Sequence, residues 1–197
     1  MVKLRARCIL VGDAAVGKST LLQVFSSDGS HFQKSYSMTT GLELVTKSVN
    51  IPMSIHSVVM AASKNIQIRE LYIFDVAGRD TFVEACEKLC GWPCVGCLVF
   101  DISNKNSFSN CQQWLERVKT HCPGQQVPGV LVGNKSDLTS RREVEAVIAQ
   151  EWAQNQGLEY HETSAKEMQV CEAPFVSLAQ TYYTLYQDQL QTIQNLI

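Results

Sequence analysis

The stretch GDAAVGKS, residues 12–19, constrains the fold of this chain more than any other segment. It follows the apolar run CILV, which predicts a strand, and it leads into the helical pattern KSTLLQVFSS, residues 18–27. The pattern GxxxxGK(S/T) between a strand and a helix is typical of a loop that wraps phosphate groups. We therefore expect a βαβ unit with a phosphate site where its first strand ends.

Four positions of this loop have an expected role. Gly12 lets the chain turn off the strand, and Gly17 lets backbone N–H groups approach a ligand. Lys18 places a positive charge on the β and γ phosphates, and Ser19 can bind Mg²⁺ at the start of the helix. A glycine-rich turn with an incidental lysine is the structural alternative. The loop residues predicted to contact the nucleotide are Gly12, Asp13, Ala14, Ala15, Val16, Gly17, Lys18, Ser19 and Thr20.

Strands and helices are predicted to alternate along the chain. Four of the five apolar runs that predict strands lack the alternation of a sheet with one wet face, so both faces should be covered. The fold class is therefore α/β, with a doubly wound, mainly parallel sheet. One antiparallel hairpin strand is expected from 45–52 against 65–74, with a long tip at 53–64. The predicted strands are 4–12, 70–78, 95–103, 128–136 and 158–164, and the later helices 107–122, 141–156 and 172–197.

Composition predicts one domain spanning 1–197. With 197 residues, 45% hydrophobic and 18% charged, the chain has the size of one ordinary domain. Its closing helix, about 172–197, is longer than one sheet usually needs for cover. Past Tyr186 the apolar stripe is expected to form a partner surface, and a frayed tail is the alternative.

Charge and termini exclude several classes of partner. The net charge of −2 gives no global attraction to nucleic acid or anionic membrane. No apolar run reaches the roughly 20 residues of a membrane span, and no secretory signal is visible, so we expect a soluble intracellular protein. Because no cysteine follows Cys171 and position 2 is not glycine, no direct lipid anchor is expected.

Four cysteines lie close together: Cys86, Cys90, Cys94 and Cys97. A structural zinc site is disfavoured, because such sites usually pair CxxC motifs from separate turns. Cys97 belongs to an apolar strand and is expected to act as a small hydrophobic residue.

A second polar motif follows a predicted strand later in the chain. Asn134, Lys135 and Asp137 in VGNKSDL come directly after GVLV, so they are expected at the carboxyl edge of the sheet. A carboxylate there can accept both the N1–H and the amine of guanine, whereas adenine has no such donor pair. The motif therefore favours a guanine nucleotide over the ATP of a kinase or ATPase. The segment ETSAK is predicted to complete the base pocket with Ser164, Ala165 and Lys166.

A third motif, DVAG at residues 75–78, is interpreted as a sensor of the γ-phosphate. Asp75 ends an apolar strand and can hold the water shell of Mg²⁺, while Gly78 can present its N–H to the phosphate. Thr39 in YSMTTG is the expected second hydroxyl ligand, and Thr40 is the alternative. The predicted metal set is therefore Ser19, Thr39 and Asp75, the last through water.

Together these motifs resemble the Ras superfamily of small GTPases, in the same order over almost the whole chain. Tyr36 and Gly41 are similar in spacing to the Rab branch. The segments HFQKSYSMTTG, FDVAG, LVGNKSDL and EAPFVSLAQTYY resemble the Rab-like GTPases of the intraflagellar transport B complex of cilia. This resemblance implies a G domain that binds GTP or GDP with Mg²⁺, and it implies that Phe32 contacts the nucleotide.

The same resemblance implies a biological setting. It implies a slow GTP/GDP switch in ciliary transport, located in the cilium or flagellum, at its base and in the cytoplasm. The implied partners are other subunits of that complex, including a small β-sandwich subunit, and effectors that bind the switch regions. A structural adaptor that keeps its nucleotide as a fixed cofactor is the alternative.

One departure from the family pattern concerns hydrolysis. Arg79 follows DVAG where active relatives usually carry the glutamine that orients the attacking water. A guanidinium has no acceptor for that water, so slow GTP hydrolysis is expected. The alternative is that Arg79 stabilises transition-state charge as an arginine finger does. The predicted catalytic residues are Lys18, Thr39, Gly78 and Arg79.

Overall fold

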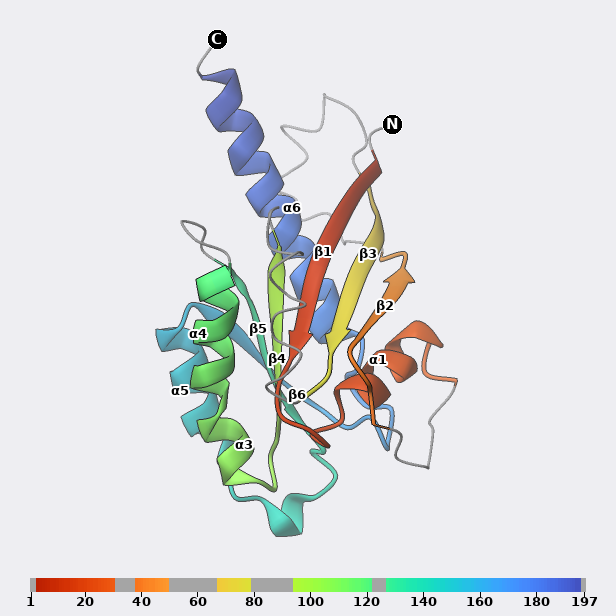
Figure 1. Cartoon of the computed structure of the whole chain (residues 1–197), viewed down its shortest axis with the longest axis vertical. Helices are drawn as coiled ribbons and strands as arrows, with labels where there is room; N and C mark the ends of the chain where they lie inside the picture. Colours follow the sequence, from red (N-terminus) through yellow and green to blue (C-terminus); the bar gives the residue numbers. More distant parts are fainter. Residues whose placement is uncertain (1–2, 31–37, 50–66, 79–93, 122–126, 196–197) are drawn as a thin grey trace.

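The structure is a computed structural model, and it describes residues 3–30, 38–49, 67–78, 94–121 and 127–195. A six-stranded sheet in the order β2-β3-β1-β4-β5-β6 runs through the molecule (Figure 1). All neighbouring pairs are parallel except β2 with β3, which confirms the predicted sheet. The strands are β1 Lys3–Val11, β2 Leu42–Lys47, β3 Gln67–Val76, β4 Val95–Asp101, β5 Gly129–Asn134 and β6 Leu158–Thr163.

Successive residues of a central strand serve two separate cores, which is why these strands are apolar without alternation. In β1, Cys8 and Leu10 belong to one cluster, whereas Ile9 and Val11 belong to the other. The first cluster is covered by α1 (Lys18–Ser26) and α6 (Ala173–Gln194). The second is covered by α4 (Cys111–His121) and α5 (Ala146–Asn155), with α3 (Lys105–Ser109) beside them. The sheet is therefore doubly wound.

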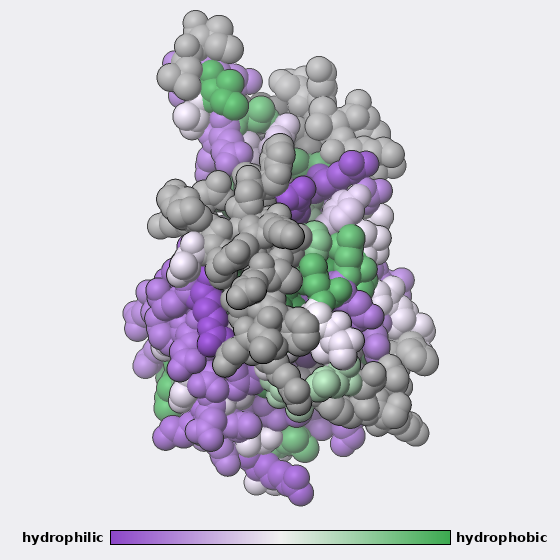
Figure 2. All heavy atoms as spheres, in the orientation of Figure 1, coloured by the Kyte–Doolittle hydropathy of each residue, from purple (hydrophilic) through white to green (hydrophobic). Residues whose placement is uncertain are grey.

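The hairpin strand is antiparallel as predicted, but its bounds differ. Strand β2 begins at Leu42 rather than at residue 45, and it pairs in register from Leu42 opposite Val76 to Lys47 opposite Leu71. Hydropathy could not find this start, because β2 is an edge strand that leaves Leu42 and Leu44 exposed. Figure 2 shows hydrophobic atoms beside β2 and β3, and hydrophilic atoms over α4. The predicted tip at 53–64 lies outside the described residues.

Two predicted helices have different bounds in the structure. Residues 107–122 were expected to form one helix, but α3 and α4 are separated by Asn110, which keeps helical dihedral angles (φ −72°, ψ −14°). The helix expected from 141 begins only at Ala146. The N–H groups of Glu143 and Val144 donate to the carbonyl of Ile102, so this backbone is tied to the end of β4 instead. A short 3-10 turn, η3 (Thr139–Arg141), precedes it.

The closing helix changes character along its length. Phe175 and Leu178 of α6 are fully buried, and Phe175 stacks on Phe25 of α1 with ring centroids 4.1 Å apart. Tyr186 still packs on the core in part, whereas Ile193 is 57% exposed. The last turns of α6 extend beyond the sheet (Figure 1). In the described part of the chain, no helix combines the length and apolar character that crossing a bilayer requires.

Cys97 is fully buried in β4, as expected for a small hydrophobic residue, and burial raises the pKa of its thiol. Cys86 and Cys90 lie outside the described residues. Among the residues that the structure describes, no group of three or more His, Cys, Asp or Glu side chains is arranged to hold a metal ion.

Candidate nucleotide-binding site

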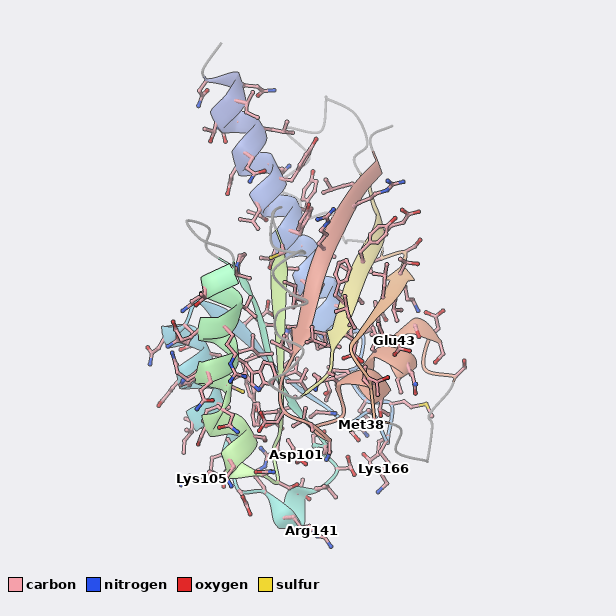
Figure 3. The ribbon with its side chains drawn as sticks, in the orientation of Figure 1. Met38, Glu43, Asp101, Lys105, Arg141 and Lys166 are labelled. Atoms are coloured by element: carbon pink, nitrogen blue, oxygen red, sulfur yellow. The ribbon has the colours of Figure 1, made fainter. Side chains whose placement is uncertain are left out.

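The predicted phosphate loop joins β1 to α1 at the carboxyl edge of the sheet. Both glycines are required by space and by backbone angle. A Cβ on Gly12 (φ +144°) would lie 2.1 Å from the carbonyl oxygen of Val99, and one on Gly17 (φ +95°) would lie 2.4 Å from Nδ2 of Asn134. The loop is therefore pressed against β4 and β5. Figure 3 shows Asp101, Met38 and Lys166 at this same end of the sheet.

Lys18 turns its amine back into the loop that it follows. Its Nζ donates to the carbonyls of Gly12 and Asp13, each at 2.8 Å, and the residue is only 6% exposed. Burial lowers the pKa of Lys18 to about 8, against the opposing attraction of Asp75 and Asp13. A buried cation in a tight backbone loop can bind a polyanion.

The three predicted metal ligands are brought together from α1, β3 and the segment that precedes β2. The Ser19 hydroxyl donates to Oδ2 of Asp75 at 2.5 Å, and its oxygen lies 2.7 Å from the Thr39 hydroxyl. Thr39, rather than the alternative Thr40, is thus the residue in contact with Ser19. Asp75 is fully buried, and burial raises its pKa against the hydrogen bond from Ser19 and the charge of Lys18.

The two oxygens of the Asp75 carboxylate differ in their contacts. Among the described residues its Oδ1 has no hydrogen-bond partner, although it is buried. An unpaired carboxylate oxygen next to two hydroxyls is a donor set that suits a hard divalent cation such as Mg²⁺. The residues present therefore fit the predicted metal.

Gly78 packs directly against the backbone of the phosphate loop. A Cβ there would be 2.3 Å from the backbone nitrogen of Ala14 and 2.5 Å from the carbonyl carbon of Asp13. The loop after β3 thus approaches the place where the outermost phosphate is expected. The next residue, Arg79, and the predicted nucleotide contact Phe32 lie outside the described residues.

Asn134 joins the phosphate loop to the ETSAK segment. Its Nδ2 donates to the carbonyl of Val16 at 3.0 Å. Its Oδ1 accepts from the hydroxyl of Thr163 at 3.1 Å and from the backbone N–H of Ala165 at 3.4 Å. Because Asn134 is 1% exposed and both ends of its amide form hydrogen bonds, it fixes the position of the two loops relative to each other.

Asp137 is oriented by the same ETSAK segment. The Ser164 hydroxyl donates to Oδ1 of Asp137 at 2.7 Å, and the amine of Lys166 lies 3.5 Å from Oδ2. The Asp137 side chain is 5% exposed, whereas that of Lys166 is 66% exposed. The base-pocket residues predicted from the sequence therefore lie together, with one carboxylate fixed between them.

Lys135 crosses from the base pocket to the phosphate loop. Its Nζ donates to the carbonyl of Ala15 at 2.8 Å and to Oδ2 of Asp101 at 2.6 Å. Burial acts to raise the pKa of Asp101, but hydrogen bonds from Lys135 and Ser103 outweigh it and hold that pKa low. Of the other predicted loop residues, Ala14 is exposed and Thr20 is half-buried in the first turn of α1.

Sequence reasoning missed four residues that shape the site: Asp101, Thr163, Asn110 and Trp114. Asp101 ends β4 at the carboxyl edge, so the rule that selected Asp75 would also have selected it. The other three carry no local signal, because their contacts join segments that are distant in the chain. Asn110 and Trp114 donate to the carboxylate of Asp13.

Comparison with known proteins agrees with this geometry. The model of the Ras family matches residues 7–184. The chain is 50% identical over 197 residues to a Bos taurus protein named intraflagellar transport protein 27 homolog, with both chains covered in full. It is 50% identical over 196 residues to the Homo sapiens protein of that name, again with both chains fully covered. It is 37% identical to intraflagellar transport protein 27 of Chlamydomonas reinhardtii, over 98% of this chain and 91% of that protein. The chain belongs to the Ras family.

Proposed function

We propose that this chain is a Rab-like GTP-binding subunit of the intraflagellar transport B complex and acts in ciliary transport as a slow GTP/GDP switch. Ras-family GTPases bind GTP and GDP with Mg²⁺ and hydrolyse GTP. The observation that carries the proposal is the convergence of Lys18, Ser19, Thr39 and Asp75 at the carboxyl edge of the sheet. The names of full-length relatives support the transport setting.

The phosphate loop is proposed to hold the polyphosphate, with the amine of Lys18 on the β and γ phosphates and the N–H of Gly78 on the γ-phosphate. Ser19 and Thr39 would bind Mg²⁺ directly, and Asp75 would hold it through water. The bound cation would neutralise charge on the phosphates. Anion binding would also offset the cost of burying the Lys18 amine.

The base is proposed to lie against the NKSD and ETSAK segments. Asp137 would accept two hydrogen bonds from guanine, with its other contacts to Ser164 and Lys166 holding it in place. Asn134 and Lys135 would act by keeping the phosphate loop at a fixed distance from the base pocket, since both donate to its carbonyls. Ala165 would face the base with its backbone, and Phe32 is proposed as a further nucleotide contact.

Slow hydrolysis is proposed because Arg79 stands where a water-orienting glutamine is usual. Arg79→Gln is expected to raise the single-turnover hydrolysis rate of pre-bound GTP by about 3- to 30-fold, because a glutamine can accept a hydrogen bond from the attacking water. A slower glutamine variant would instead indicate that Arg79 acts as an arginine finger.

The proposed partners are other subunits of the intraflagellar transport B complex, including a small β-sandwich subunit, and effectors of the switch regions. The proposed locations are the cilium or flagellum, its base and the cytoplasm. The end of α6 is the proposed docking surface, because its last turns extend beyond the sheet with Ile193 exposed.

A structural adaptor with a fixed nucleotide is the second candidate, favoured by Arg79. The two candidate functions differ in whether the bound nucleotide is exchanged. A switch should exchange GDP for GTP and bind partners differently in the two states, whereas an adaptor should do neither.

The test begins with the full chain purified and its bound nucleotide identified after denaturation. We expect the bound nucleotide to be GDP or GTP, and we do not expect ATP to compete for the site.

Ser19→Asn should favour the GDP-bound or the empty state, because the amide disrupts coordination of the metal. Ser26→Asn is the matched control, since Ser26 is an exposed residue of the same helix. If Ser19→Asn binds GTP like wild type with and without Mg²⁺, the proposed metal site is wrong.

A further inference from the structure

Asp13 is one of the loop residues predicted to contact the nucleotide, and its side chain contacts Asn110 and Trp114. The indole Nε1 of Trp114 donates to Oδ1 of Asp13 at 2.7 Å. The side-chain amide of Asn110 donates to Oδ2 at 2.8 Å. Both carboxylate oxygens are therefore engaged by α4 and the residue that precedes it.

The two donors are held rigidly. They are four positions apart in continuous helical backbone, where the N–H of Trp114 donates to the carbonyl of Asn110 at 3.1 Å, so they lie on one face. Trp114 is 4% exposed and packs in the core cluster on that side of the sheet. A carboxylate that accepts one bond on each oxygen from fixed donors has a defined position and orientation.

The backbone of Asp13 is in turn part of the phosphate loop. Its carbonyl accepts a hydrogen bond from the amine of Lys18. Its carbonyl carbon lies close enough to Gly78 to exclude a side chain there. Fixing the Asp13 side chain therefore fixes the loop next to two groups proposed to bind phosphate.

The orientation of the Asp13 side chain is important because its carboxylate is negatively charged. A carboxylate in a loop that binds a polyphosphate would repel its ligand if it turned toward it. The hydrogen bonds from Asn110 and Trp114 hold it in one orientation and stabilise its charge. The same contact thus places the loop and keeps its anion from the ligand.

We propose that Asp13 is a positioning residue for nucleotide retention, which acts by anchoring the phosphate loop to Trp114 and Asn110. This inference rests on the proposed guanine-nucleotide binding. The anchor acts on the phosphate end of the ligand and so serves GDP and GTP alike.

The test is the dissociation rate of fluorescent GDP from the loaded full chain with Mg²⁺ present. Trp114→Phe keeps an aromatic ring in the core but removes the donor, and it should speed dissociation by about 5- to 30-fold. This is less than the full loss of a hydrogen bond to a charged group, because the contact acts on the nucleotide only through the loop. The matched control is Trp152→Phe on α5, whose ring contacts Phe108, and it should stay within about twofold of wild type.

Asp13→Asn separates anchoring from simple repulsion. If charge repulsion were the whole effect of Asp13, its removal would slow dissociation. Anchoring predicts the opposite, because one amide oxygen cannot serve both donors as a carboxylate does. In addition, the Asp13→Ala and Trp114→Phe changes should not add in the double variant, since both break the same contact.

A spectroscopic signature keeps the proposal testable apart from kinetics. The indole N–H resonance of Trp114, identified by its loss in Trp114→Phe, should move in Asp13→Asn while that of Trp152 stays in place. Unchanged GDP dissociation in both variants, additive effects or an unmoved Trp114 resonance would overturn the anchor. A wild-type chain that binds no guanine nucleotide would instead overturn the proposed function beneath it.

Discussion

The two halves of the candidate site are built differently. On the base side, formed by Asn134, Lys135 and Asp137, each side chain already contacts a second loop. On the phosphate side, formed by Lys18, Ser19, Thr39 and Asp75, charges are buried without full compensation. The amine of Lys18 contacts backbone carbonyls, and one oxygen of Asp75 has no hydrogen bond among the described residues.

This difference indicates which half depends on its ligand. Burial lowers the pKa of Lys18 and raises that of Asp75, so burial disfavours the ionised form of each side chain. A polyphosphate with a divalent cation would supply the opposite charges. The side chains of the base side already have partners within the protein, so we expect these internal contacts to contribute to stability whether or not a ligand is bound.

The largest effect is expected at Lys18. Lys18→Met keeps the stem of the side chain but removes the buried charge, and it should weaken GDP binding by about 100-fold or more. Titration with fluorescent GDP measures this. Lys119→Met is the control, because the Lys119 side chain on α4 is 41% exposed and pairs with Glu116 at 3.5 Å. Binding within about threefold of wild type would remove Lys18 from the phosphate site.

Asp137 should give the next largest effect. Asp137→Asn should weaken GTP binding by about 30- to 100-fold, because an amide replaces an acceptor of two hydrogen bonds by a donor and an acceptor. Xanthine nucleotides should gain relative to guanine, since their ring presents the complementary pattern. Competition between GTP and XTP measures the change, and Asp188→Asn on the exposed face of α6 is the control. Equal GTP affinity in Asp137→Asn and wild type would exclude this base contact.

The contribution of Asp75 should appear only through the metal. GDP dissociation from the wild type should be slowed by Mg²⁺, and Asp75→Asn should lose about tenfold of that slowing, because the neutral amide holds the cation's water shell poorly. With the metal chelated, the two proteins should differ little. Dissociation rates measured with and without chelator test this, and a loss of affinity independent of Mg²⁺ would contradict the assigned role.

Local sequence predicted the phosphate side better than its surroundings. Gly12, Gly17 and Lys18 act within one loop, so their spacing alone carries the signal. Asp75 and Asn134 were found because each ends an apolar strand at the carboxyl edge of a parallel sheet. The direct contact of Ser19 with Thr39 also agrees with the predicted metal set.

The contacts that fix the loops could not be predicted in this way. Asp13 reaches Trp114, and Asn134 reaches Thr163, only after the sheet has brought distant segments together. The start of β2 at Leu42 was missed because that strand is defined by backbone pairing with β3 and not by burial. The helix predicted from residue 141 begins later, because the backbone before it forms hydrogen bonds to Ile102 that no local sequence pattern predicts.

The smallest expected effect tests the internal contact of the base side. The hydroxyl of Thr163 donates to Oδ1 of Asn134 at 3.1 Å, and Thr163 is fully buried. Thr163→Val keeps the shape of the side chain and removes this bond, so it should lower the free energy of unfolding by about 1 kcal/mol. Because the contact lies wholly within the protein, the loss should be the same for the nucleotide-free and the GDP-loaded chain.

Denaturant unfolding of both forms measures that equality. Thr184→Val is the matched control, since Thr184 is exposed on α6 and donates only to the carbonyl of Gln180 one turn away. It should change stability by a few tenths of a kcal/mol at most. A Thr163→Val loss confined to the loaded chain would mean that nucleotide binding forms this contact, and the base side would then depend on its ligand as the phosphate side does.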